Sequence, residues 1–344
     1  MGRHPARRDR PGGRIMSSGP LPDRSSVKVV AVVVAFNRRD LLKDALDALD
    51  AQTHPLAGVV VVDNRSDDDS AVVAAEHPIG ATVLELSRNT GGAGGFAAGI
   101  AHALSEFDPE CLWLMDDDTI PTPSALDELL RAREEYPEPV ALLGSRVVWH
   151  DGRDHPMNTP RRRPGATRDE ISDSSAVGAV PVRSSSFVSM LIDTRAVRYH
   201  GLPIADYFIW NDDFEYSCRI LRRGIGLYVP ASVVEHRTQK FGATDTDPGD
   251  RFYFEVRNKI WMLTRSTSLS PEERVLYAGS SLRRWTRTFA GSSQRAVLRR
   301  AAIKGIRDGM LRGPRSTVKV LDGSGISTDE VLDAEAGSPR RRGE

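Results

Sequence analysis

Three consecutive carboxylates, Asp116, Asp117 and Asp118, follow the apolar stretch Cys111–Met115. Adjacent negative charges repel each other, and strand stability gives no reason to place them together. A divalent cation that bridges to a diphosphate would relieve the repulsion, because Mg²⁺ and Mn²⁺ prefer a few carboxylates plus substrate oxygens. Alternate residues of an extended segment point the same way, so Asp116 and Asp118 are predicted to share a face as metal ligands. The competing interpretation is a polar turn before a helix near Ser124.

A second acidic cluster, Asp212, Asp213 and Glu215, follows the apolar stretch Tyr207–Trp210. Transfer of a group onto a hydroxyl needs a base that takes the hydroxyl proton, and a carboxylate beside the donor can do this. The alternative is that these acids start a helix and stabilise its dipole. Taken alone, the cluster is compatible with both interpretations.

His236 ends the apolar run Leu227–Glu235. A single histidine at a strand end is more often a surface or hydrogen-bonding residue than a ligand. Beside an aspartate metal site, however, a neutral imidazole is a common metal ligand. The sequence therefore offers His236 as a third ligand next to Asp116 and Asp118.

The segment Asn89–Gly99 is rich in glycine. Gly92, Gly94 and Ala97 fit the dinucleotide fingerprint G-x-G-x-x-G/A, and Asp116 follows at about the distance of a ribose-binding acid. An NAD-dependent oxidoreductase is therefore a rival function. Two observations argue against an oxidoreductase. Such an enzyme needs one acid at this position, not three, and its glycines follow the first strand of the sheet, whereas these follow the third predicted strand. A non-catalytic sugar- or nucleotide-binding module would not need both acidic clusters. We favour a glycine-rich turn that brings backbone close to a nucleotide.

Apolar runs alternate with helical patterns along the first half of the chain, and the connections are short. This alternation is typical of a doubly wound, mostly parallel α/β sheet. Polar segments over 151–178 and 240–250 are expected to form a mobile loop and a flexible lid. Strands are predicted at Val27–Phe36, Val59–Val62, Thr82–Leu86, Cys111–Met115, Phe187–Asp193 and Leu227–Glu235, and helices at Asp40–Ala51, Gly91–Leu104 and Trp210–Arg223.

In such sheets ligands bind beyond the carboxyl ends of the strands. Polar residues follow each of the first four predicted strands: Asn37 and Arg38, Asp63 and Asn64, Arg88 and Asn89, and Asp116 to Asp118. Because these ends can converge on one crevice, the sequence predicts a nucleotide site there.

The chain divides into four predicted regions: a disordered basic tail over 1–26, an α/β domain over 27–250, a basic helical appendage over 251–315 and a disordered tail over 316–344. The third region holds 15 lysines and arginines against 4 acidic residues. Such a surface attracts anions, so it either packs on the main domain as a solvated appendage or contacts an anionic membrane or a lipid diphosphate. Nucleic acid is not an expected partner.

The cysteine content and the absence of long apolar stretches indicate in which cellular compartment the protein is located. The two cysteines, Cys111 and Cys218, are too few and too far apart for a disulfide framework or a zinc cluster, so both are expected to be buried thiols. The first 26 residues contain no apolar stretch of the kind a signal peptide needs, and no window approaches the length of a membrane span. We expect a cytoplasmic protein, peripheral on the inner face of the plasma membrane.

Six segments in register resemble the family 2 glycosyltransferases over roughly residues 27–266: AFNR, VVDN, NTGGAGG, LMDDD, WNDDFEY and EH. Each is weak alone, and the set is highly specific. The combination is most similar to the galactofuranosyltransferases of cell-wall galactan synthesis, and rhamnosyltransferases are close relatives. The resemblance implies a GT-A fold with a helical appendage, a UDP-linked donor, a lipid-linked saccharide acceptor and Mn²⁺ or Mg²⁺. We expect the large trailing domains of the galactan polymerases to be absent or short here, which favours an initiating or few-residue transferase.

The resemblance also assigns roles to matching positions. It implies uridine contacts for Arg38, Asp63 and Asn89, a ribose contact for Asp117, and metal binding by Asp116, Asp118 and His236. It makes Asp213 the catalytic base of an inverting single displacement. The remaining residues would bind sugars: Trp210 walls the sugar site, and Asp212 and Glu215 hold acceptor hydroxyls.

Overall fold

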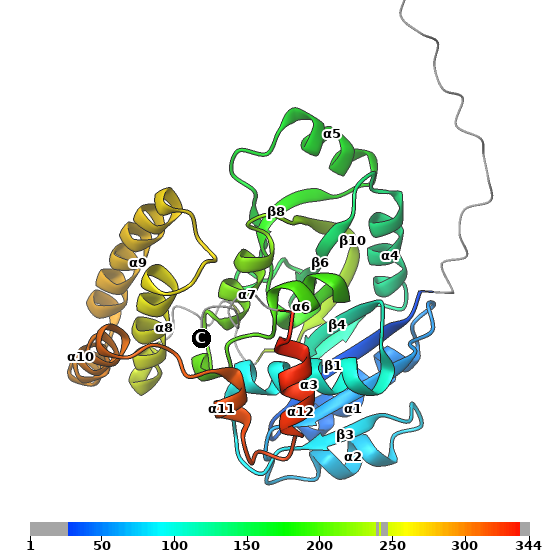
Figure 1. Cartoon of the computed structure of the whole chain (residues 1–344), viewed down its shortest axis with the longest axis horizontal. Helices are drawn as coiled ribbons and strands as arrows, with labels where there is room; N and C mark the ends of the chain where they lie inside the picture. Colours follow the sequence, from blue (N-terminus) through cyan, green and yellow to red (C-terminus); the bar gives the residue numbers. More distant parts are fainter. Residues whose placement is uncertain (1–26, 239–240, 242–246, 338–344) are drawn as a thin grey trace, which may run out of the picture.

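The computed structural model describes residues 27–238, 241 and 247–337. Its centre is a 10-stranded mixed sheet of order β3-β2-β1-β4-β9-β6-β10-β8-β7, with β5 paired to β10 (Figure 1). The strands are β1 (Val29–Ala35), β2 (Gly58–Asp63), β3 (Thr82–Glu85), β4 (Cys111–Asp116), β5 (Thr119–Pro121), β6 (Val140–Val148), β7 (Arg161–Arg162), β8 (Val180–Ser184), β9 (Met190–Asp193) and β10 (Ile225–His236). The predicted basic tail and residues 240 and 242–246 of the predicted lid lie outside the described residues.

Helices cover both faces of this sheet and extend beyond it (Figure 1). They are α1 (Arg39–Asp50), α2 (Ser70–Glu76), α3 (Gly91–Phe107), α4 (Ala125–Glu135), α5 (Arg168–Ala176), α6 (Thr194–His200), α7 (Asp212–Ile220), α8 (Phe252–Thr264), α9 (Pro271–Gly291), α10 (Arg295–Leu311), α11 (Thr317–Leu321) and α12 (Thr328–Glu335). β1 to β4 run parallel, and β9 joins them antiparallel. The predicted α/β fold class is confirmed.

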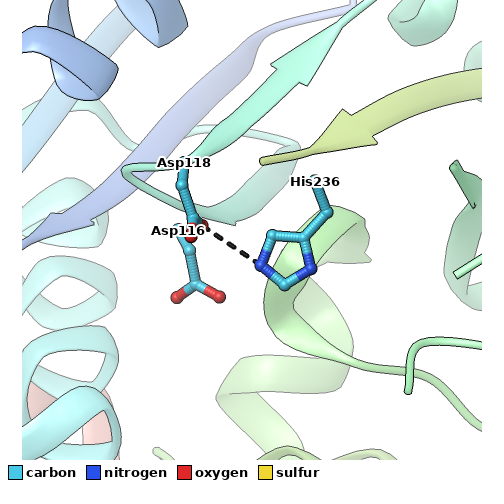
Figure 2. A group of neighbouring side chains, drawn as sticks. All are labelled: Asp116, Asp118 and His236. Atoms are coloured by element: carbon cyan, nitrogen blue, oxygen red, sulfur yellow. Dashed lines mark ion pairs between the residues drawn. The ribbon is translucent and has the colours of Figure 1, made fainter. Parts of the chain in front are cut away.

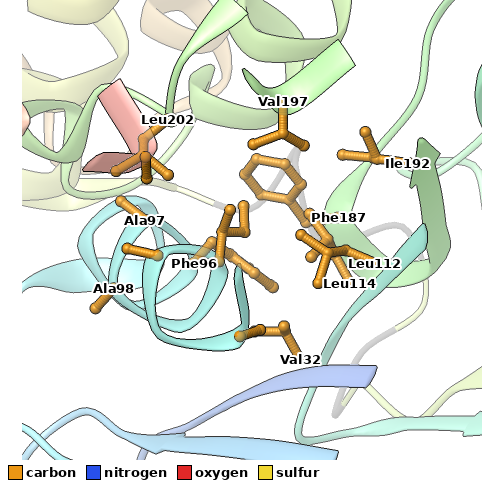
Figure 3. Close-up of a cluster of buried hydrophobic side chains, with 14 of the residues drawn as sticks. Val32, Phe96, Ala97, Ala98, Leu112, Leu114, Phe187, Ile192, Val197 and Leu202 are labelled. Carbon is orange, nitrogen blue, oxygen red and sulfur yellow. The ribbon is translucent and has the colours of Figure 1, made fainter. Parts of the chain in front are cut away.

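β1 lies in the middle of the parallel strands because it is apolar throughout, and every one of its residues is buried. Val30, Val32 and Val34 belong to the core under α3, while the alternate residues pack towards α1 and α4. Figure 3 shows Val32 below α3 and the α3 residue Phe96 beside Phe187, with ring centroids 4.5 Å apart. Burial of each large apolar side chain contributes about 1.5–3 kcal/mol. The ends of these strands therefore stand on a rigid platform.

Two glycines test how closely α3 packs on the sheet. A Cβ added at Gly99 would lie 2.5 Å from Val32 Cγ1 and 2.7 Å from Val62 Cγ2, whereas a Cβ at Gly279 in α9 would meet nothing within 4 Å. We expect Gly99→Ala to lower the free energy of unfolding by about 1–3 kcal/mol, because the buried valines cannot move aside. Gly279→Ala should raise it by about 0.4–1 kcal/mol. Urea unfolding measures both, and equal midpoints for the two variants would contradict this packing.

Helices α8, α9 and α10 stand to one side of the sheet domain (Figure 1). α8 packs on α10 around Phe252 and Leu298. α9 is tied to the sheet by Arg183 of β8, which donates to both carboxylate oxygens of Glu273 at 2.7 and 2.9 Å and to the Ser268 carbonyl at 2.6 Å. The basic segment is thus attached through buried polar contacts, and much of its surface stays exposed.

The predicted disordered tail over 316–344 is wrong for residues 316–337. α11 and α12 cover the outer face of α3, where Leu321 and Val331 are buried in the same core as Ile100. His102 of α3 pairs with Glu330 of α12 at 2.9 Å between Nδ1 and Oε2. This segment therefore buttresses the helix whose first turn reaches the crevice.

Two smaller expectations are also corrected, and a third is confirmed. The predicted loop over 151–178 contains α5, whose start is closed by a capping box between Thr167 and Glu170. The predicted strand Phe187–Asp193 begins with a 3-10 turn, and its strand is β9 alone. Both cysteines are buried free thiols, as expected, and burial raises the pKa of each to about 12.

Candidate active site

Strand register brings the polar strand ends together. Asp63, the last residue of β2, pairs with Ala35 of β1, and Asp116, the last residue of β4, pairs with Val34. β1 therefore has one aspartate on each side of its carboxyl end. The predicted convergence of the strand ends on one crevice is present for these two residues.

Asp116, Asp118 and His236 form a group in which one ligand atom from each residue lies within 4.8 Å of the others. Figure 2 shows the imidazole of His236 directed at the two carboxylates. Asp118 follows the end of β4 and His236 ends β10, and β10 is held beside this turn because Glu235 pairs with Ile120 of β5. The three predicted metal ligands thus come together from two separate parts of the chain.

The hydrogen bonds of His236 fit a metal ligand. Its Nδ1 lies 3.0 Å from Asn158 Oδ1, and Asn158 is oriented by its donation to Ser186 Oγ at 3.2 Å. An amide oxygen only accepts, so Nδ1 carries the proton and the lone pair of the neutral ring is on Nε2. Nε2 faces Asp118 Oδ1 at 3.1 Å, an oxygen that is buried without a hydrogen-bond donor. Two facing lone pairs require a cation between them, either a proton or a metal.

The charges around this group show the same demand for a cation. Burial, followed by the charge of Asp118, raises the pKa of Asp116 to about 6. Burial opposes the protonation of His236, yet its contact with Asp118 raises the His236 pKa above the ordinary value. The contact with His236 lowers the pKa of Asp118 although burial opposes this, so Asp118 keeps a negative charge beside Asp116. A pair of buried carboxylates of this kind is an environment that a divalent ion stabilises.

The residues predicted to bind the nucleotide surround the same strand ends. Burial raises the pKa of Asp117 to about 7, against the effect of the Arg38 guanidinium 3.2 Å away. Arg38 also pairs with Asp118 at 2.5 Å. Asp63 accepts from the Ser66 amide at 3.1 Å, and its other carboxylate oxygen is buried without a hydrogen-bond partner. Asp63 therefore has a free acceptor for a ligand.

Asn89 stands in the turn that starts α3. It is exposed, and its Oδ1 accepts from the Gly91 amide at 2.8 Å. The turn is anchored by Asn64, which donates to the Gly91 carbonyl at 2.9 Å and accepts from the Thr90 amide at 2.8 Å. Asn64 directly follows Asp63, so the second strand end and the glycine-rich turn are joined.

Before α7 the chain takes an unfavourable backbone path. Phe208, Trp210 and Asn211 all have positive φ, near +65°, which is uncommon for residues other than glycine. Asn258 of α8, fully buried, holds this loop with its Nδ2 within 3.0 Å of the carbonyl oxygens of Tyr207, Ile209 and Trp210. Such strain costs of order 1–3 kcal/mol per residue and concentrates at functional sites. It sets the direction in which α7 starts.

The first turn of α7 directs Asp212 and Asp213 towards the metal group. Asp212 Oδ2 lies 4.0 Å from the place of a Cβ on Gly92, at the start of α3. Burial, then the charge of Asp213, raises the pKa of Asp212 well above its ordinary value, and Asp116 adds to this effect. Asp212 and Asp213 therefore both lie close enough to Asp116 to interact with its charge.

Asp213 lines a pocket of about 170 Å³. Its Oδ1 accepts from the Phe214 amide at 2.6 Å, and burial raises its pKa, opposed by the charges of Lys259 and Arg161. Burial lowers the pKa of Lys259 to about 8. The pocket thus offers one carboxylate base among basic and hydroxyl groups. Its other lining residues include Asn158, Ser184, Ser185, Ser186, Asn211 and Arg284.

The position of Glu215 differs from the expected one beside the acceptor. It does not line the Asp213 pocket; instead it is buried behind it, paired with Arg219 at 3.1 Å and accepting from Ser266 Oγ at 2.6 Å. Its place is a structural network under α7. Trp210 is half-buried in the strained loop, beside α3, because the Phe208 carbonyl accepts from the Ala93 amide at 3.2 Å.

The sequence analysis assigned no role in the site to Asn158, Lys259 or Asn258. Asn158 lies in a polar segment without periodicity. Lys259 and Asn258 lie in the segment Arg257–Lys259 of an apolar helix, where two polar residues and a lysine interrupt the aromatic stretch. This interruption was the one feature of the sequence that could have indicated a functional role for the segment. In the structure all three of its polar side chains are buried.

Comparisons with known proteins match this geometry. Residues 30–191 match the family described as Glycosyl transferase family 2. Galactofuranosyltransferase GlfT1 of Mycobacterium tuberculosis is 32% identical over 267 residues, covering 69% of this chain and 82% of that protein. S. aureus TarS 1-349 in complex with UDP has a TM-score of 0.57 at 14% identity and covers 92% of each chain. GalNAc-T7, solved with UDP, GalNAc and Mn²⁺, has a TM-score of 0.50 at 14% identity and covers 74% of this chain and 54% of that one.

The rival prediction of an NAD-dependent oxidoreductase is wrong. Gly94 and Ala97 lie inside α3, and a Cβ at Gly94 would lie 2.4 Å from Thr90 Oγ1, so this glycine serves a close approach within the turn. The GT-A fold and the enzyme class expected from the motifs are confirmed by the matches. The chain belongs to glycosyl transferase family 2.

Proposed function

We propose that this enzyme transfers galactofuranose from UDP-galactofuranose to a lipid-linked saccharide of the cell envelope, with inversion at the anomeric carbon. The observation that carries the proposal is the metal-type group of Asp116, Asp118 and His236, which lies close enough to Asp213 for the charge of that carboxylate to raise the pKa of Asp116. The donor sugar is supported by the similarity to GlfT1, whose name states galactofuranosyl transfer.

Asp213 is the proposed base. Its half-buried carboxylate takes the proton of the acceptor hydroxyl as that oxygen attacks the anomeric carbon. Asp212 beside it holds an acceptor hydroxyl, and Trp210 walls the sugar. Mn²⁺ or Mg²⁺, when held by Asp116, Asp118 and His236, would supply stabilisation of the charge on the departing diphosphate.

The donor's nucleotide is proposed to bind over the ends of β1, β2 and β4. The free oxygen of Asp63 accepts from the uridine, and Asp117 accepts from the ribose. Arg38 and Asn89 complete this part of the site. TarS, which shares the fold, was solved in complex with UDP, and this supports a UDP-linked donor.

The proposed location is the inner face of the plasma membrane. Within the described ranges, none of the helices combines the length and apolar character needed to cross a bilayer. The net charge of residues 251–315 is +11, and apolar side chains such as Leu276 and Met310 on α9 and α10 are exposed. Basic and apolar side chains together favour contact with anionic lipid.

A transfer assay tests the proposed function. UDP-galactofuranose and, separately, dTDP-rhamnose are offered with a synthetic alkyl-linked rhamnosyl-GlcNAc acceptor, each with Mn²⁺ and with EDTA. We expect product from the first donor only, and only with metal. Product from dTDP-rhamnose alone would keep the enzyme class and replace the sugar, and no product from either would refute the proposed function.

A further inference from the structure

Two pockets meet at Arg284 of α9. One is the Asp213 pocket, and the other is a larger pocket of about 470 Å³ on α9, here called the arginine pocket. Because Arg284 lines both, the arginine pocket is adjacent to the proposed acceptor hydroxyl site. The arginine pocket is lined by Asp247, Ser280, Arg283, Arg284, Arg287, Thr288, Gly291 and Ser292.

The charge of the arginine pocket is strongly positive. Arg283 and Arg287 are exposed, and neither forms an ion pair with another residue that the structure describes. Arg284 pairs with Glu255 of α8 and keeps its side chain half-exposed. The lining contains one acid, Asp247, whose Oδ2 accepts from Ser292 Oγ at 2.6 Å and from the Gln294 amide at 3.3 Å, while its Oδ1 is buried without a hydrogen-bond partner. Three arginines outnumber this one carboxylate. Two guanidinium groups are therefore available to an anion.

A neutral saccharide gives no reason for such a row of cations. Sugar hydroxyls are matched by the serine and asparagine side chains of the Asp213 pocket. Guanidinium groups instead bind phosphate oxygens with paired, charge-assisted hydrogen bonds. The ligand group that fits the arginine pocket is thus a phosphate or diphosphate, held beyond the saccharide.

Apolar residues continue from the arginine pocket. Leu276, Ser280, Arg283 and Arg287 are spaced by three and four residues, so they share one face of α9. Leu276 on this face is 72% exposed. The face therefore presents an exposed apolar side chain together with cations, the two features that the lipid and the diphosphate of a lipid-linked acceptor would contact.

We infer that Arg283, Arg284 and Arg287 bind the diphosphate that joins the acceptor saccharide to its lipid. This inference rests on the proposed function and adds a separate anion site to it, on α9 and away from the donor diphosphate. The enzyme then recognises its acceptor at two positions: the attacking hydroxyl binds at Asp213, and the diphosphate binds at α9.

The test compares two acceptors with the same saccharide, one on a short alkyl diphosphate and one on a neutral short alkyl chain, with UDP-galactofuranose and Mn²⁺. In the Arg283→Gln/Arg287→Gln variant the preference for the diphosphate acceptor, measured as the ratio of the two kcat/KM values, should fall about tenfold or more. The fall should lie in KM. Arg299→Gln/Arg300→Gln on α10, the same charge change outside the pocket, should keep the wild-type ratio. An unchanged ratio in the pocket variant, with transfer intact, would overturn the inference alone.

Two further measurements separate the remaining outcomes. If the pocket variant loses binding to anionic phosphatidylglycerol vesicles while its acceptor ratio stays at the wild-type value, the arginines bind lipid headgroups and the inference is wrong. If the wild type transfers to neither acceptor, the proposed function fails. Calorimetric titration with the saccharide alkyl diphosphate still tests the pocket in that case: binding by the wild type and its loss in the variant support the site, and no binding by the wild type refutes it.

Discussion

Replacing Asp213 by asparagine is expected to lower kcat for sugar transfer by about 10²–10⁴-fold, the usual contribution of a general base. Asparagine keeps the Oδ1 that accepts from the Phe214 amide, so the start of α7 is retained. It removes the charge that takes the proton from the acceptor hydroxyl. UDP binding in the presence of Mn²⁺, measured by calorimetry, should remain at the wild-type level because the nucleotide residues lie at the strand ends.

Asp212→Asn is the matched control, since it makes the same carboxyl-to-amide replacement one residue away. Asp212 is proposed to hold an acceptor hydroxyl, so its loss should act mainly on the acceptor KM. If Asp213→Asn kept its kcat, or if both variants lost kcat equally, Asp213 would not be the base.

The second large effect is expected at the metal group. Asp118→Asn removes the charge that faces His236 Nε2, and Mn²⁺-dependent UDP binding should fall by about a hundredfold or more. The scale follows from residues that merely orient metal ligands, whose loss costs about 10–100-fold in affinity. Titration of UDP with Mn²⁺, and again with EDTA, measures the effect.

Asn158→Leu provides the comparison within the same site. It leaves all three ligands in place but removes the acceptor for His236 Nδ1, so its effect should lie within about 10–100-fold. Wild-type protein that bound UDP equally in EDTA would exclude the metal group from donor binding. So would an Asp118→Asn variant that bound UDP normally with Mn²⁺.

The parallel half of the sheet was predictable because its strands are continuous apolar runs. Such runs occur where both faces of a strand are covered, and polar residues directly after them mark the strand ends. The pairing of Asp116 with Asp118 followed from alternation along an extended chain. His236, more than a hundred residues away, was a candidate ligand by its residue type at a strand end and by the family resemblance, but no local pattern places the end of β10 beside β5.

Glu215 was misplaced although helix geometry was sufficient to separate it. Successive residues of an α-helix are about 100° apart, so positions 213 and 215 point in nearly opposite directions. An acid two residues after Asp213 in a helix therefore faces the core of the domain, where Arg219 one turn later balances its charge. The three acids of this cluster therefore cannot all face the same pocket.

The segment over 316–337 was misjudged because its helices are too short for a visible repeat. α11 has 5 residues and α12 has 8, and isolated helices of this length are unstable in water. They are stable here because α3 offers them an apolar face. Asn158 and Lys259 escaped prediction for a related reason: their roles come from contacts with residues distant in sequence.

The cover that α11 and α12 place on α3 has a consequence for biosynthesis. α3 leaves the ribosome about 220 residues before α12, which at 5–20 residues per second is on the order of ten to forty seconds. During that time Ile100 and its apolar neighbours on α3 lack their final cover. The nascent chain therefore presents an adhesive apolar stripe next to its future nucleotide site, and a chaperone that binds such stripes would hold the unfinished enzyme until residue 335 emerges.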